Sequence, residues 1–227
     1  MGSTIQDGML YLSSKFSKTL KSRFGKGPET CYVTFVENKL FIYINHFMTP
    51  AEEVLVENHQ GELANRFRRS VMDVICKEFI HDASNLVNVE LQYALHDWNY
   101  DTNKGIVIME SAGVSSKEFG YSSFENKLSK LFAQIASRVH KVPDEMKIVK
   151  INQNVCVFEC TGVMLSLDRY LYENGQTNLL HDHTHELKKA LSEYKPHFEA
   201  IFTRELEDFF IIWEYEKDKS YVIFNFL

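Results

Sequence analysis

The sequence predicts an α+β protein built from two tandem modules, and two repeated blocks carry that prediction. The first block, Trp-x-Tyr at 98–100 with a polar turn and an apolar run after it, returns as Trp-x-Tyr at 213–215 with the same continuation. The second block, VLVEN at 54–58, returns as YLYEN at 170–174. The offsets of 115 and 116 residues differ by one insertion, so we expect a duplicated unit.

Each module is expected to follow the order α-β-β-α-β-β. Its four-stranded sheet should be mainly antiparallel, because the links within each strand pair are too short for a parallel crossover. A chain of 227 residues suits two domains. We assign them to 1–113 and to a diverged copy at 120–227, with a small, polar linker at 111–123. Duplication commonly fuses the halves of a symmetric dimer, so we expect the modules to pack as a pseudo-dimer.

In the first module, apolar residues at helical spacing predict a helix over 9–24, which the GKGP segment at 25–28 ends. Two apolar runs over 32–47 predict a β-hairpin. The segment TPAE at 49–52 predicts a helix start, because Thr can cap, Pro suits the first turn and Glu completes a capping box.

That second helix is expected to reach about Ile80, with a break near Gly61. Alternation over 87–95 and an apolar run over 106–110 predict the closing strands. The second module should repeat the order with a helix over 124–139 and a hairpin over 147–161. A helical region from Ser166 and a terminal hairpin over 205–226 complete it.

Composition excludes several classes of protein. The net charge of −6 provides no basic field for a nucleic acid partner. The sequence shows no hydrophobic signal segment and no apolar run long enough for a transmembrane helix. We therefore expect a cytoplasmic protein whose contact with a membrane would be peripheral. The lysines and arginine of the first helix predict a solvated face, with membrane-surface contact as the alternative.

The cysteines are Cys31, Cys76, Cys156 and Cys160, and their spacing fits reduced thiols rather than disulfides or zinc ligands.

Several segments of the first module together resemble the MpsC component of a bacterial Na⁺-translocating, membrane-potential-generating system. These are GKGPE at 25–29, the strand after it, Thr49-Pro50, LVE at 55–57 and the stretch from Gly61 to Arg69. The second module keeps Pro143 and YLYEN but has lost GKG and the arginines. The resemblance implies a soluble accessory protein of an ion or inorganic-carbon transport system, and it carries no catalytic residues.

The segment LHDHTHE at 180–186 is the most metal-like stretch. On a helix, His181 and His185 lie one turn apart, while on an extended segment His183 joins them on one side. A solvated polar helix face is the interpretation we adopt, because the matching stretch of the first module has no ligands and the order differs from HExxH. We therefore assign no metal and no cofactor, with these histidines as weak candidates.

Candidate ligand-binding residues occur in both modules. Arg66 and Arg69 share a helix face and could clamp an anion, or form surface ion pairs with residues such as Asp73. Glu57 and Glu173 occupy the same position of the repeated block. They could meet as paired carboxylates that shift each other's pKa, or each could belong to a local turn or cap.

Three functions follow from these features. The first is a non-enzymatic accessory or interaction protein that contacts membrane transport subunits. The second is a sensor that binds a small anion between the modules. The third is a metal-dependent enzyme at His181, His183 and His185, and the absence of a recognisable catalytic motif ranks it last.

Overall fold

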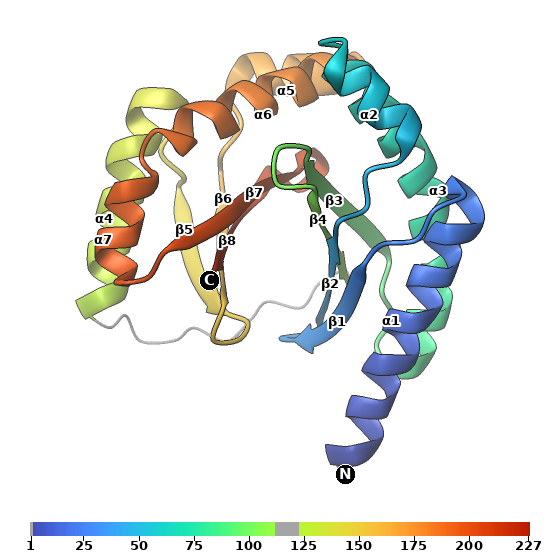
Figure 1. Ribbon diagram of the computed structural model, residues 1–227. Helices are drawn as coiled ribbons and strands as arrows, with labels where there is room; N and C mark the ends of the chain where they lie inside the picture. Colours follow the sequence, from blue (N-terminus) through green and yellow to red (C-terminus); the bar gives the residue numbers. More distant parts are fainter. Residues whose placement is uncertain (1, 112–122) are drawn as a thin grey trace. The chain divides into compact units, whose positions relative to one another are not determined.

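The computed structural model describes residues 2–111 and 123–227, which form two compact units (Figure 1). The elements of the first unit are α1 (Gly2–Phe24), β1 (Thr30–Val36), β2 (Lys39–Asn45), α2 (Pro50–Glu57), α3 (Gly61–Val87), β3 (Tyr93–Asn99) and β4 (Lys104–Glu110). Its sheet has the order β1-β2-β4-β3, and every pair of neighbouring strands is antiparallel.

The first core lies between the sheet and the helices α1 and α3, which run along one face of the sheet (Figure 1). Helix α1 contributes Leu12, Phe16 and Leu20, which are spaced by four residues and fully buried. Phe16 meets Phe79 of α3 edge to face, with ring centroids 4.8 Å apart. The helical periodicity predicted for these segments is therefore the periodicity that builds the core.

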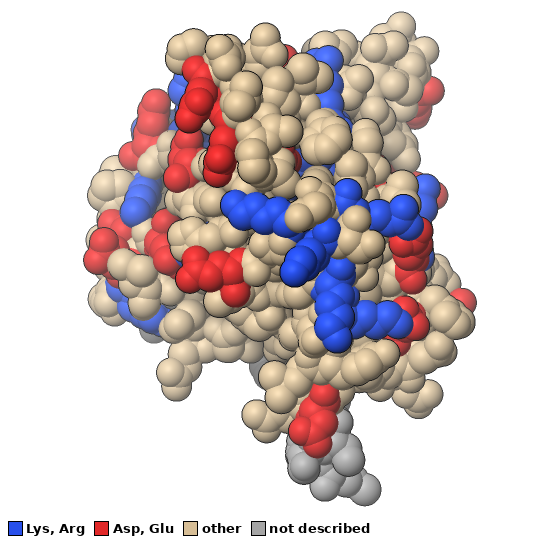
Figure 2. Space-filling model, turned by 45° about the vertical axis from the view of Figure 1, so that its right-hand side comes forward, with Lys and Arg blue, Asp and Glu red and all other residues tan. Residues whose placement is uncertain are grey.

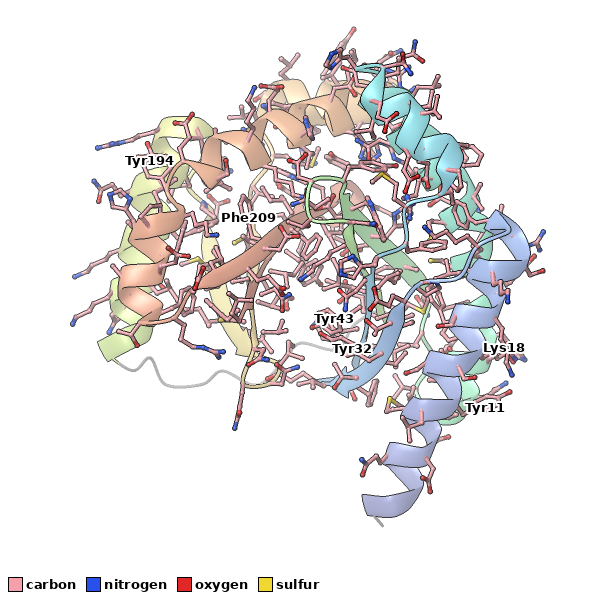
Figure 3. All side chains as sticks on the ribbon, viewed as in Figure 1. Tyr11, Lys18, Tyr32, Tyr43, Tyr194 and Phe209 are labelled. Atoms are coloured by element: carbon pink, nitrogen blue, oxygen red, sulfur yellow. The ribbon has the colours of Figure 1, made fainter. Side chains whose placement is uncertain are left out.

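The sheet of the first unit is apolar on both faces. Alternate residues of β2 point toward the helices, and the residues between them, Phe41 and Tyr43, are also buried. Tyr43 stacks on Tyr32 of the neighbouring strand with ring centroids 4.5 Å apart (Figure 3). Burial raises the pKa of the Tyr43 hydroxyl well above its usual value.

Residues with positive φ form three turns of the first unit. Glu37 and Asn38 both have positive φ and close the tight β1–β2 hairpin. Gly25, with a φ of 77°, ends α1 where the GKGP segment predicts. His59 is left-handed as well and separates α2 from α3, so the break expected near Gly61 is confirmed.

The second unit has the same strand arrangement. Its elements are α4 (Ser123–Val139), β5 (Glu145–Lys150), β6 (Val155–Thr161), α5 (Ser166–Glu173), α6 (Thr177–Ser192), α7 (Lys195–Phe202), β7 (Leu206–Glu214), the short helix η1 (Tyr215–Lys217) and β8 (Lys219–Phe226). The sheet order is β5-β6-β8-β7, again antiparallel throughout. Helices α4, α6 and α7 pack on one face.

Matching registers show that the repeat is structural. Trp98 lies opposite Gly105 in the first sheet, and Trp213 lies opposite Ser220 in the second. Both partners are 115 positions apart, as the repeated block requires. The predicted α+β class with two four-stranded antiparallel sheets is confirmed. The boundary residues 113 and 120 and most of the linker lie outside the described residues, and the pseudo-dimer stays a prediction.

One expectation about an element is wrong. The alternation over 87–95 is not a strand, because α3 continues to Val87 and β3 begins only at Tyr93. Asn88 ends the helix in the left-handed conformation, and Ser84 then accepts a hydrogen bond from the main chain of Leu91, at 3.0 Å. The alternating side chains pack on the core from a helix end and a loop. In the second unit the helical region expected from Ser166 is confirmed, and it consists of three helices, the last with Pro196 in its first turn.

Basic side chains of α1 are partly neutralised by acids of α3. Lys15 lies 2.6 Å from Asp82, and Arg23 pairs with Glu78. Figure 2 shows Lys and Arg side chains gathered above the N-terminal end of α1, with Asp and Glu beside them, and Figure 3 shows Lys18 and Tyr11 pointing outward from this helix. Of the helices described, none has the length and hydropathy to cross a bilayer.

Gly105 tests how closely the first unit is packed. A Cβ at this position would lie 1.9 Å from Cε3 of Trp98, so Gly105→Ala must displace the indole ring. We expect a loss of about 1–3 kcal/mol in the free energy of unfolding, typical of overpacked cores. Gly61→Ala is the matched control, because nothing lies within 4 Å of its Cβ. It should be neutral or stabilising by up to about 1 kcal/mol. Equal changes in the free energy of unfolding for the two variants, measured by urea unfolding, would contradict this expectation.

The cysteines are free, and burial raises the pKa of Cys76 and Cys160 to about 12 and that of Cys31 to about 11. At pH 8 roughly one thiol in 10⁴ is ionised at a pKa of 12, and the thiolate is the reactive form. The native protein should therefore react slowly with a thiol-specific chromogenic reagent and release four equivalents after denaturation. Rapid labelling of Cys76 or Cys160 in the native state would contradict the expected burial.

Candidate functional site: a buried polar centre in each unit

The start of α2 places a carboxylate inside the first unit. Thr49 is the N-cap, and its main-chain N–H and its hydroxyl donate to Oε2 of Glu52 at 2.9 and 2.7 Å. This is the capping box that the sequence predicts, with Pro50 in the first turn. The side chain of Glu52 is fully buried, however, so its charge needs a partner inside the protein.

Arg68 of α3 supplies that partner. Its Nε donates to Oε1 of Glu52 at 2.7 Å, and a terminal nitrogen donates to Oε2 at 2.5 Å. The same nitrogen donates to the carbonyl oxygen of Phe47 at 2.9 Å. The residue is only 2% exposed, so the pair is a bidentate ion pair shielded from water. It ties α2, α3 and the chain after β2 together.

Aromatic rings enclose the guanidinium group. Its carbon lies 3.9 Å from the centroid of a Trp98 ring, and Phe24, Phe47 and Tyr100 lie within 5.6 Å. This is a cation–π arrangement on several sides. The hydroxyl of Tyr100 donates to Oε1 of Glu52 at 3.3 Å, and burial raises the Tyr100 pKa. We call Thr49, Glu52, Arg68, Trp98 and Tyr100 the first polar centre.

The second unit buries a carboxylate at the same point of its fold. Asp168 occupies the position of Glu52 in α5 and is 3% exposed. Its Oδ2 accepts from the main-chain N–H of Leu165 at 2.8 Å, as Glu52 accepts from Thr49. Leucine has no hydroxyl, so this carboxylate has one cap hydrogen bond fewer than its counterpart.

The second unit has no arginine at the position that matches Arg68. Counted from the first residues of α3 and α6, Arg68 corresponds to Thr184, whose hydroxyl contacts Tyr215 instead. Two histidines lie beside the carboxylate. Nε2 of His140 is 3.4 Å from Oδ2 of Asp168, and Nδ1 of His183 is 3.4 Å from Oδ1.

His140 also contacts the main-chain carbonyl that matches the one bound by Arg68. Its Nε2 lies 3.0 Å from the carbonyl oxygen of Val163, which corresponds to Phe47, the residue whose carbonyl Arg68 binds. Its ring is 5.4 Å from Trp213 and 5.2 Å from His183. Burial lowers the pKa of His140, against the opposing effect of Asp168, so its neutral form is favoured. We call His140, Asp168, His183 and Trp213 the second polar centre.

The two centres differ in what they can do chemically. The first is a closed ion pair between a guanidinium group and a carboxylate. The second contains two imidazoles and a carboxylate, which can exchange protons or bind a metal ion. Donor atoms of His140, Asp168 and His183 lie within 4.8 Å of one another.

The residues predicted from the repeated block lie elsewhere. Glu57 and Glu173 are exposed at the ends of α2 and α5. The following asparagines explain the repeat, because Asn58 and Asn174 each donate a side-chain hydrogen bond to the carbonyl four residues earlier, at 2.7 and 2.8 Å. The local-cap alternative therefore has a structural basis.

The predicted arginines lie on the surface of α3 beside acids. Arg66 is 3.8 Å from Glu62. Arg69 contributes to the lowered pKa of Asp73, after the larger effect of the hydrogen bond from His96. The arginine between them, Arg68, is the one that lies inside the fold, and a buried i, i+16 partner such as Glu52 has no local signal in the sequence.

The histidine run is helical, so its three members separate. His183 joins the second polar centre, His181 lies 6.1 Å from the Tyr215 ring, and His185 is exposed. No spacing in the sequence links His183 with His140 or Asp168. The available signal is an acidic residue in the first turn of the matching helix of both repeats, Glu52 and Asp168.

Removing the guanidinium group tests the first polar centre. Arg68→Met leaves a buried carboxylate without its cation, which typically costs about 3–5 kcal/mol. Hydrogen exchange of α3 amides, which reports on the first unit, should show this loss. The control Arg66→Ala removes an exposed arginine and should change stability by less than about 0.5 kcal/mol. If Arg68→Met and Arg66→Ala have equal effects, the ion pair does not stabilise the unit.

Comparison with known proteins gives one match. Residues 10–111 match a family described as "Na+-translocating membrane potential-generating system (MpsC)". The match covers most of the first unit, including its polar centre. No curated protein and no solved structure matches the chain. Residues 10–111 are therefore a domain of the MpsC family, followed by a second unit with the same sheet order.

Proposed function

We propose that the protein is a non-enzymatic accessory subunit that acts in the cytoplasm and binds membrane-embedded subunits of an ion transport system. Two points support this proposal. The family of its first domain is described by a Na⁺-translocating system. The observation that carries the proposal is a set of exposed apolar side chains that recurs at matching positions of both units.

The recurring surface is the corner between two helices. In the first unit, the main-chain N–H of Gln60 donates to the carbonyl of Leu55 at 2.7 Å across the left-handed His59. In the second, Gln176 donates to Leu171 at 2.8 Å across Gly175. The corners therefore have the same hydrogen-bonding pattern.

Each corner exposes large apolar side chains. Val54 and Leu63 are 57% and 52% exposed, and their counterparts Tyr170 and Leu179 are 62% and 51% exposed. A single exposed apolar side chain needs no explanation. Two pairs of them at the same positions, in units whose other surface residues have diverged, favour a surface that contacts another molecule.

Acidic side chains accompany the apolar positions of the first corner, where Glu53, Glu57 and Glu62 are exposed. At the second corner only Glu173 recurs, because Arg169 and Asn178 stand in the places of Glu53 and Glu62. The cytoplasmic loops of membrane proteins carry an excess of Lys and Arg next to apolar segments. The charge of the first corner, and the glutamate shared by both corners, are complementary to such a loop. Glu57 and Glu173 are thus the candidate ligand-binding carboxylates, with a basic peptide as ligand.

Co-sedimentation with membranes from the native source tests the proposal. The wild-type chain should sediment with the membranes, and Val54→Lys with Leu63→Lys should reduce the bound fraction at least tenfold. Tyr170→Lys with Leu179→Lys tests the second corner in the same way. The control Leu10→Lys changes an apolar residue of α1 that is 64% exposed and should bind like the wild type.

A comparison of membranes distinguishes a protein partner from lipid. Protein-free vesicles of the same lipids should not bind the chain, and Glu57→Lys should weaken binding to native membranes. Binding that the corner variants leave unchanged would refute the corner as the docking surface. Equal binding to protein-free vesicles would refute a protein partner.

A further inference from the structure

The buried carboxylate of the second unit lacks a fixed countercharge. Glu52 binds a guanidinium group, but the ion-pair partners that the described residues provide for Asp168 are two histidines. A carboxylate that is 3% exposed must be neutralised by a proton, a cationic side chain or a metal ion. Imidazoles satisfy this need only when they are protonated or when they share the carboxylate with a metal ion.

The three side chains come from different segments that the fold brings together. His140 follows the end of α4, Asp168 lies in the first turn of α5, and His183 lies in the middle of α6. Nδ1 of His183 is 3.4 Å from Oδ1 of Asp168. Ligands about 2.0–2.1 Å from a tetrahedral zinc ion are separated by about 3.3 Å. The His183–Asp168 separation therefore matches that of two ligands of one ion, and a donor atom of His140 lies within 4.8 Å of the other two.

His140 has the bonding pattern of a metal-binding histidine. One ring nitrogen faces the carbonyl oxygen of Val163 at 3.0 Å, and within the described residues the other, Nδ1, is buried without a hydrogen-bond partner. Metal-bound imidazoles usually donate one N–H to a carbonyl and use the other nitrogen as ligand. The side chain of His140 is 7% exposed, so Nδ1 has little access to solvent.

We propose that His140, Asp168 and His183 bind a divalent transition-metal ion, with zinc as the ion best suited to two imidazoles and one carboxylate. Three protein ligands leave the fourth position of a tetrahedral ion for a water molecule. The side chain of His183 is 40% exposed, so solvent reaches the centre from that side. The site differs from the histidine run of the sequence, since His181 and His185 take no part.

Zinc retention by the full chain tests the proposal. The protein is stripped with a chelator, loaded with zinc sulfate, desalted and analysed by elemental analysis, and a chromogenic chelator gives the affinity. We expect about one zinc per wild-type chain. His183→Ala should weaken zinc binding at least tenfold, since even residues that only orient metal ligands change affinity by about 10–100-fold. His140→Gln should act in the same direction.

The matched control is the double variant His181→Ala, His185→Ala, which keeps the three proposed ligands. It should retain zinc like the wild type. The visible spectrum of the Co²⁺-loaded protein should show tetrahedral coordination, and His183→Ala should abolish it. Circular dichroism verifies that each variant is folded, and the half-exposed position of His183 makes its variant the decisive one.

Two outcomes would overturn the proposal. One is a wild-type chain that retains no zinc after desalting. The other is zinc that is lost in the double control but kept in His183→Ala, which would show adventitious binding by the exposed helix face. Neither result affects the docking corners, whose test depends on membranes and not on metal.

Discussion

A buried carboxylate at the start of a helix is the constraint on which both units depend. Glu52 and Asp168 cap the helix that follows the first hairpin, and each is withdrawn from water. An uncompensated charge in that position would cost several kcal/mol, so the surrounding segments must supply a countercharge and hydrogen bonds. In both units the repeated tryptophan lies against the side chain beside the carboxylate, Trp98 against Arg68 and Trp213 against His140.

The two units meet the same constraint with different chemistry. A guanidinium group is a permanent cation that reaches both carboxylate oxygens and a carbonyl at once. Imidazoles depend on proton or metal activity in the surrounding solution. The zinc ion proposed for the second polar centre would therefore link the stability of the second unit to the zinc concentration, whereas the first unit carries its countercharge within its own chain.

Local signals in the sequence identify the elements and the duplication, but they do not identify the sites. The capping box at Thr49 and the Trp98 repeat follow from spacing alone. The strand expected from Val87 fails because alternating apolar residues also suit a helix end that packs on the core. Arg68 and His140 could not be predicted as site residues, because their partners are distant in sequence. Arg68 binds the carbonyl of Phe47 from α3, whereas His140 contacts the matching carbonyl of Val163 from the end of α4.

The placement of the thiols has a practical consequence for spectroscopy. Cys76, Cys156 and Cys160 are buried, and Cys31 is partly covered. A cysteine introduced at an exposed helical position would therefore be the fast-reacting thiol of the chain without removal of the natural ones. Pairs of fluorophores or spin labels, one on each unit, could then report distances in solution with the native interior intact.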